Sequence, residues 1–187
     1  MDETQKEAER LGIKRVLIVD DSDENLSAAA QYFSNVLGCE IRVDYSQNGE
    51  DAKGLIQSAF EQKNNIGLVI TDLEMETDLA GLEVMSQAYR FGSEAMLLTG
   101  RQGDGTHHGH GPSTSLCSIY SIKRNLTRNG LKSETGVWDW AFNESLKQLT
   151  GTNSLRESLH RYEQYVGFPR SVDAMKLVDI AIYCLVQ

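Results

Sequence analysis

The stretch Ile66 to Met75, IGLVITDLEM, constrains the fold of this chain more than any other. Its first half is a short run of branched apolar side chains, which is too short for a buried helix and typical of a strand buried on both faces. The run ends on Thr71 and Asp72. Packing explains a carboxylate at the end of such a strand poorly, whereas in open α/β sheets this edge is where ligands bind. We therefore take Asp72 as the centre of a candidate site.

Similar apolar runs alternate along the chain with segments of helical periodicity. Strands are predicted over 15–20, 40–45, 66–71, 95–98 and 116–122, and helices over 26–37, 52–60, 81–91 and 137–149. This alternation predicts βαβ units and therefore a parallel sheet with right-handed crossovers. Five strands of this length are typical of a doubly wound, flavodoxin-like α/β domain with strand order 2-1-3-4-5.

The pattern changes after the fourth predicted strand. Residues 101–115 contain several glycines and Pro112, which cost a helix roughly 1 kcal/mol and about 3 kcal/mol each, so a Gly/His loop is expected where a fourth helix would stand. Two further helices are predicted over 153–166 and 172–186, and the last one is apolar on nearly every side. We expect a lead-in over 1–12, an α/β domain over 13–150, and a helical extension over 151–187 that packs on the domain or on a second copy.

The composition limits the classes of partner and compartment. The net charge of −9 argues against nucleic acid or an anionic membrane as the main partner. Cys39, Cys117 and Cys184 are odd in number and far apart, which favours reduced thiols over a disulfide framework. The charged start of the chain resembles no signal peptide, and no apolar segment is long enough to span a bilayer. A soluble cytoplasmic protein is therefore expected.

Polar side chains stand at the ends of four predicted strands, namely Asp20 with Asp21, Asp72, Thr99 and Lys123. Two carboxylates ~4 Å apart repel by about 4 kcal/mol at an effective dielectric near 20, so three of them in one cleft require a counter-ion. Carboxylate oxygens with room for water suit Mg²⁺ or Mn²⁺. The lysine and the threonine could then bind phosphoryl oxygens beside a carboxylate nucleophile.

Each of these side chains alone has a structural explanation. Asp21 could cap a helix, Asp72 could begin a turn, Thr99 could bond the backbone in the core, and Lys123 could be solvated. The joint occurrence of all of them, each at a strand end, favours a site.

At this point the chain resembles the receiver domain of two-component response regulators, over roughly residues 13–150. Four motifs carry the resemblance: VLIVDD at 16–21, VITDLEM at 69–75, LLTG at 97–100, and Tyr120 three residues before Lys123. The resemblance implies a phosphoprotein in which Asp72 accepts a phosphoryl group from a sensor histidine kinase or a histidine phosphotransfer protein. It also implies Mg²⁺ held by Asp21, Asp72 and the backbone carbonyl of Glu74, with Asp20 helping through water.

The resemblance further implies a switch and a mode of output. Thr99 and Tyr120 would move together on phosphorylation, and the output would be contact with a downstream protein. A homodimer would form if the extension over 151–187 packs on a second copy. No enzymatic activity is expected beyond self-phosphorylation from small donors and autodephosphorylation. The autodephosphorylation should be slow, because Glu74 and Arg101 could pair across the path of the attacking water. The chain departs from the family at Glu76 and Arg124, where proline is common.

Two other functions stay open. One is a receiver-like interaction module that is never phosphorylated, which the complete set of polar strand ends disfavours. The other is an aspartyl-nucleophile phosphatase, for which Glu74 would be an imperfect acid/base. In the loop, His107, His108 and His110 could bind a transition metal, although a polar loop without metal is favoured because no fourth ligand is visible.

Overall fold

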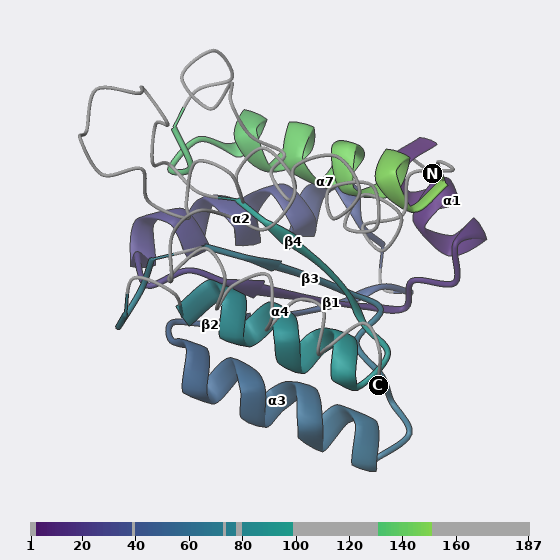
Figure 1. Cartoon of the computed structure of the whole chain (residues 1–187). Helices are drawn as coiled ribbons and strands as arrows, with labels where there is room; N and C mark the ends of the chain where they lie inside the picture. The colour runs from purple at the N-terminus through teal and green to yellow at the C-terminus, as the bar shows by residue number, and fades with distance from the viewer. Residues whose placement is uncertain (1–2, 39, 73, 78–79, 99–130, 151–187) are drawn as a thin grey trace, which may run out of the picture.

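The computed structural model describes residues 3–38, 40–72, 74–77, 80–98 and 131–150 (Figure 1). Its strands are β1 (Arg15–Val19), β2 (Arg42–Ser46), β3 (Leu68–Thr71) and β4 (Glu94–Leu97), and they form one parallel sheet in the order β2-β1-β3-β4. The prediction of a parallel α/β sheet is confirmed, and these strands stand in the predicted order. The predicted fifth strand, the Gly/His loop and the extension over 151–187 lie outside the described residues.

Helices cover both faces of this sheet (Figure 1). On one face lie α2 (Asp23–Val36) and α7 (Thr135–Thr150), together with the short helix α1 (Glu3–Arg10). On the other face lie α3 (Gly49–Glu61) and α4 (Ala80–Arg90). In the part of the chain that the structure describes, no helix has the length and hydropathy needed to cross a membrane.

The apolar runs of the sequence become strands that are buried on both faces. In β1, Val16 and Ile18 pack into the cluster under α2 and α7, whereas Leu17 and Val19 pack into the cluster under α3 and α4. Successive side chains of a strand point to opposite faces, so a strand covered on both sides is apolar at nearly every position. All residues of β1 and of β3 are buried.

The element bounds differ from the prediction mainly near the edges of the domain. The lead-in forms an eight-residue helix, α1, in which Ala8 is fully buried and the Thr4 hydroxyl donates to Asn143 Oδ1 of α7 at 3.0 Å. The edge strand β2 begins at Arg42 rather than at Glu40. Its Asp44 forms an ion pair with the buried Arg15, which explains how a charged residue is accommodated in β1.

Candidate functional site

The register of the sheet brings the acidic strand ends together. Val19 of β1 lies beside Thr71 of β3, and the backbone N–H of Asp72 donates to the carbonyl of Val19 at 2.8 Å. Asp20 and Asp72 therefore leave neighbouring strands at the same edge. Asp20, Asp21 and Asp72 each place a carboxylate oxygen within 4.8 Å of those of the other two.

The three carboxylates differ in their access to solvent. The Asp20 side chain is 1% exposed and that of Asp72 is 13% exposed, whereas Asp21 is exposed. Asp20 is thus the buried acid of the site, and Asp21 is the acid that solvent reaches most easily. The exposed fraction of Asp72 is intermediate between those of Asp20 and Asp21.

Every oxygen of the buried Asp20 carboxylate has a donor. Oδ1 accepts from the Ser22 N–H at 3.1 Å and from Asn25 Nδ2 at 2.8 Å, and Oδ2 accepts from Lys132 Nζ at 2.6 Å. Ser22 is also the N-cap of α2, where its side chain accepts from the Asn25 N–H. A buried charge is tolerated when it is paired and hydrogen-bonded in this way. The first turn of α2 therefore fixes the orientation of this carboxylate.

Lys132 bridges two of the acids. Its Nζ lies 2.6 Å from Asp20 Oδ2 and 2.6 Å from Asp72 Oδ2, and its side chain is 9% exposed. The backbone carbonyl of Lys132 accepts from the indole Nε1 of Trp138 at 2.7 Å, and Trp138 is itself buried in α7. Three carboxylates and one ammonium leave a formal charge of −2, which one divalent cation would balance.

Lys132 was not found by sequence reasoning, which assigned the lysine of the site to Lys123. Lys123, Thr99 and Tyr120 lie outside the described residues, so their roles stay predictions, as does the metal site considered in the His107–His110 loop. The available signal was the position of Lys132, three residues before α7 begins at Thr135. It lies between the predicted strand over 116–122 and the predicted helix over 137–149, in a segment with neither pattern.

The loop from β3 to α4 passes directly beside Asp72. Met75 is partly buried against the cluster under α3 and α4, and its N–H donates to the Thr77 carbonyl at 3.2 Å. The carboxylate of Glu76 accepts from the backbone N–H of Gly49, the first residue of α3, at 2.8 Å. The predicted ligand role of the Glu74 carbonyl stays a prediction.

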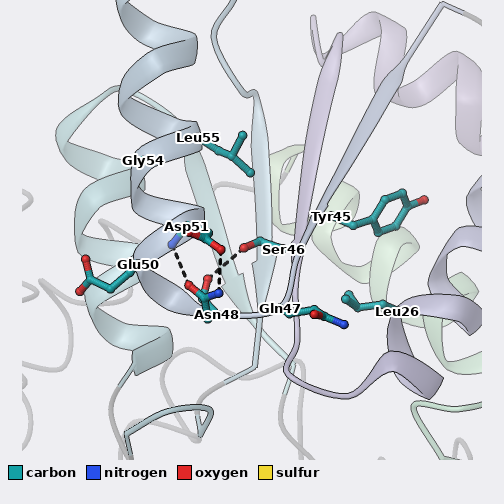
Figure 2. Close-up of a pocket in the computed structure, with 9 residues that line it drawn as sticks. All are labelled: Leu26, Tyr45, Ser46, Gln47, Asn48, Glu50, Asp51, Gly54 and Leu55. Atoms are coloured by element: carbon teal, nitrogen blue, oxygen red, sulfur yellow. Dashed lines mark hydrogen bonds between the residues drawn. The ribbon is translucent and has the colours of Figure 1, made fainter.

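A hollow of about 740 Å³ opens near the end of β2, between α2 and α3 (Figure 2). Leu26, Tyr45 and Leu55 supply its apolar lining, and on its polar side Asn48 caps α3 by accepting from the Asp51 N–H at 2.8 Å. Burial, with a smaller contribution from Asp44, raises the pKa of Tyr45 to about 12. The acids of the site do not line this hollow.

Comparisons with known proteins find similarity at the level of structure. No protein-family model and no curated protein matches the sequence. Among solved structures, the response regulator domain of Thermotoga maritima CheB is similar, with 17% sequence identity and a TM-score of 0.45, over 74% of this chain and 94% of that chain. This is a domain of the class that the sequence motifs resemble.

Proposed function

We propose that this chain is a phosphoryl-accepting receiver, in which Asp72 takes a phosphoryl group from a phosphohistidine of a sensor histidine kinase or a histidine phosphotransfer protein. In this step the N–P bond of the donor breaks and an O–P bond to an Asp72 carboxylate oxygen forms, leaving the donor imidazole free. The observation that carries the proposal is the position of Asp72, within 4.8 Å of two further carboxylates and 2.6 Å from an ammonium group.

The donor set supports Mg²⁺, or Mn²⁺, as the cofactor. Carboxylate oxygens are the ligands that these ions prefer, and the formal charge of −2 that remains after pairing with Lys132 equals the charge that a divalent cation neutralises. Asp21 and Asp72 would hold the ion with the Glu74 carbonyl, and Asp20 would help through water. When bound, such an ion withdraws charge from the phosphoryl oxygens.

Lys132 is our candidate for the group that neutralises the phosphoryl oxygens from the protein side. Its ammonium group already bonds the Asp72 oxygen and can transfer to a phosphoryl oxygen while keeping its bond to Asp20. Asp20 itself keeps its orientation through Asn25. Thr99 and Tyr120 remain the proposed switch pair, and Lys123 is the alternative candidate for the lysine role.

The reaction is stoichiometric, so the chain acts as a signalling component whose output is contact with a downstream protein rather than as an enzyme. The test is to incubate the protein with acetyl phosphate and Mg²⁺ and to measure the intact mass. The wild type should gain one phosphoryl group, whereas Asp72→Asn and protein treated with a chelator should gain none. Asp23→Asn, which removes an exposed acid outside the cluster, should behave like the wild type. An unmodified wild type would favour the interaction module that is never phosphorylated.

A second comparison assigns the lysine. Lys132→Ala should slow phosphorylation by at least about tenfold, because it removes the cation beside the acceptor oxygen. Lys123→Ala should leave the rate unchanged. The opposite pattern would return the role to Lys123.

A further inference from the structure

The loop that follows Asp72 is tied to a helix from a different part of the chain. Glu76 Oε1 accepts from the Gly49 N–H at 2.8 Å, across 27 residues of sequence. Gly49 is buried and follows the N-cap Asn48, so no carbonyl within the helix can accept from its N–H. The Glu76 carboxylate supplies the missing acceptor, and its negative charge is also favoured at the positive end of the helix dipole.

This contact depends on the absence of a side chain at position 49. A Cβ added to Gly49 would lie 2.7 Å from Glu76 Oε1, 3.4 Å from Val84 Cγ2 and 3.6 Å from Ala80 Cβ. Real Cβ atoms do not approach an oxygen so closely, so the carboxylate would have to shift away from its present position. Glycine at position 49 and glutamate at position 76 therefore form one structural unit.

The unit acts at the end of the segment that borders the candidate site. Glu76 lies four residues after Asp72 and two after Glu74, and Met75 between them inserts into the cluster under α3 and α4. The segment therefore has one apolar anchor and one polar anchor on the same face of the sheet. The polar anchor lies two residues from Glu74, and the apolar anchor is the next residue.

We propose that Glu76 is a positioning residue, whose bond to the Gly49 amide holds the segment 74–77 in place beside Asp72. This rests on the proposed function where it concerns Mg²⁺, because the Glu74 carbonyl is the ligand that the segment would present. It explains how a chain with glutamate in place of the usual proline keeps this segment ordered.

The test uses two pairs of variants on the full-length protein. Glu76→Ala removes the carboxylate, and Glu76→Gln keeps an acceptor oxygen while it removes the charge. Gly49→Ala displaces the carboxylate from its present position, and Gly54→Ala makes the same substitution in the same helix at a position where an added Cβ meets nothing within 4 Å. Denaturant unfolding identifies any variant whose fold is lost.

Amide hydrogen exchange without metal reports on the contact directly. In Glu76→Ala and Gly49→Ala, exchange at residue 49 and over 74–77 should accelerate about tenfold, the loss expected for a hydrogen bond to a charged group. In Gly54→Ala it should stay within about twofold of the wild type, since the added Cβ meets nothing within 4 Å. In Glu76→Gln it should accelerate by about threefold, since the neutral amide oxygen is a weaker acceptor than the carboxylate. Unchanged exchange in Glu76→Ala would overturn the proposal.

Mg²⁺ affinity, measured by calorimetry, tests the consequence for the site. Glu76→Ala and Gly49→Ala should bind Mg²⁺ about tenfold more weakly, as is typical when a residue that orients a ligand is removed. Glu76→Gln should recover most of this loss. If Glu76→Gln binds as weakly as Glu76→Ala, the effect is one of charge and the positioning role is wrong. A wild type that binds no Mg²⁺ would instead contradict the proposed function, and hydrogen exchange would still decide whether Glu76 holds the segment.

Discussion

The two faces of the sheet differ in what packs on them. Under α2 and α7, the buried cluster contains large aromatic side chains, including Phe33 and Phe142, whose rings meet edge to face with centroids 5.2 Å apart. Under α3 and α4, the buried side chains of the described cluster are aliphatic, and many are alanines. Close approach of small side chains thus holds one face together, and interlocking of large ones holds the other.

The site divides along the same line. The helices on the aromatic face orient the charged groups. Asn25 of α2 donates to the Asp20 carboxylate, and Trp138 of α7 donates to the backbone carbonyl of Lys132. The aliphatic face holds the loop from β3 to α4, because Glu76 of this loop accepts from the first residue of α3. The charges of the site therefore depend on the larger core, while the loop beside Asp72 depends on a contact at the start of α3.

The largest change in the free energy of unfolding should come from truncating a side chain in either core. Phe142→Ala should lower the free energy of unfolding by about 4 kcal/mol, and Met85→Ala on the other face by about 3 kcal/mol, because the aromatic truncation leaves the larger cavity. Denaturant titration of both variants measures the difference. A greater loss for Met85→Ala would reverse the assignment of the dominant core.

The next effect concerns the charges that the aromatic face supplies. Lys132→Ala should cost about 3 kcal/mol at neutral pH in the metal-free protein, because it leaves the nearly buried Asp20 without its cation. The matched control is Lys147→Ala in α7, whose side chain is 70% exposed and pairs with Glu144, and it should cost less than about 1 kcal/mol. Equal losses would mean that the ion pairs of Lys132 stabilise the fold no more than an exposed ion pair does.

A smaller effect concerns the residue that orients Asp20. Asn25→Ala should cost about 1.5 kcal/mol, since it removes a hydrogen bond to a buried carboxylate. Ser34→Ala on the same helix, where the hydroxyl is exposed, should stay within about 0.5 kcal/mol of the wild type. Thermal and urea unfolding together measure both. If Asn25→Ala costs no more than Ser34→Ala, the hydrogen bond from Asn25 to Asp20 does not contribute to stability.

The smallest effect lies at the hollow beside β2, and it depends on pH. The pKa of Tyr45 is raised from 10.0 to about 12, so the fold favours the neutral phenol. This stabilisation is complete below pH 10 and is lost as the pH rises toward 12. The wild type should therefore lose stability relative to Tyr45→Phe between pH 8 and pH 11, as measured by urea unfolding. A constant difference between the two proteins would show that Tyr45 ionises as freely in the fold as in the unfolded chain.

Local patterns were enough to predict the sheet and the place of the acids. Continuous apolar runs predict the buried strands β1 and β3. Parallel pairing then places Asp20 and Asp72 at the same edge of the sheet. Helix α7 was predicted from its apolar spacing to within a few residues. These features depend on neighbours in the sequence, so the sequence contains them directly.

The contacts that complete the site depend instead on distant residues. Lys132 meets Asp20 across 112 residues and Asp72 across 60, and this contact depends on how the chain enters α7. Glu76 meets Gly49 across 27 residues, at a point where the sequence shows only an unusual residue after a methionine. No periodicity records such pairings, because each is decided by where two separate elements end in space.

The bond between Trp138 and the Lys132 carbonyl has a practical consequence. The indole is 1% exposed, so its emission should be that of a tryptophan shielded from water. Any shift of the lysine backbone would alter the field at this fluorophore, so loading of the acidic site should be visible as a change in intrinsic fluorescence without an attached dye. Replacing Trp140 with phenylalanine would leave Trp138 as the sole emitter, because the chain contains two tryptophans.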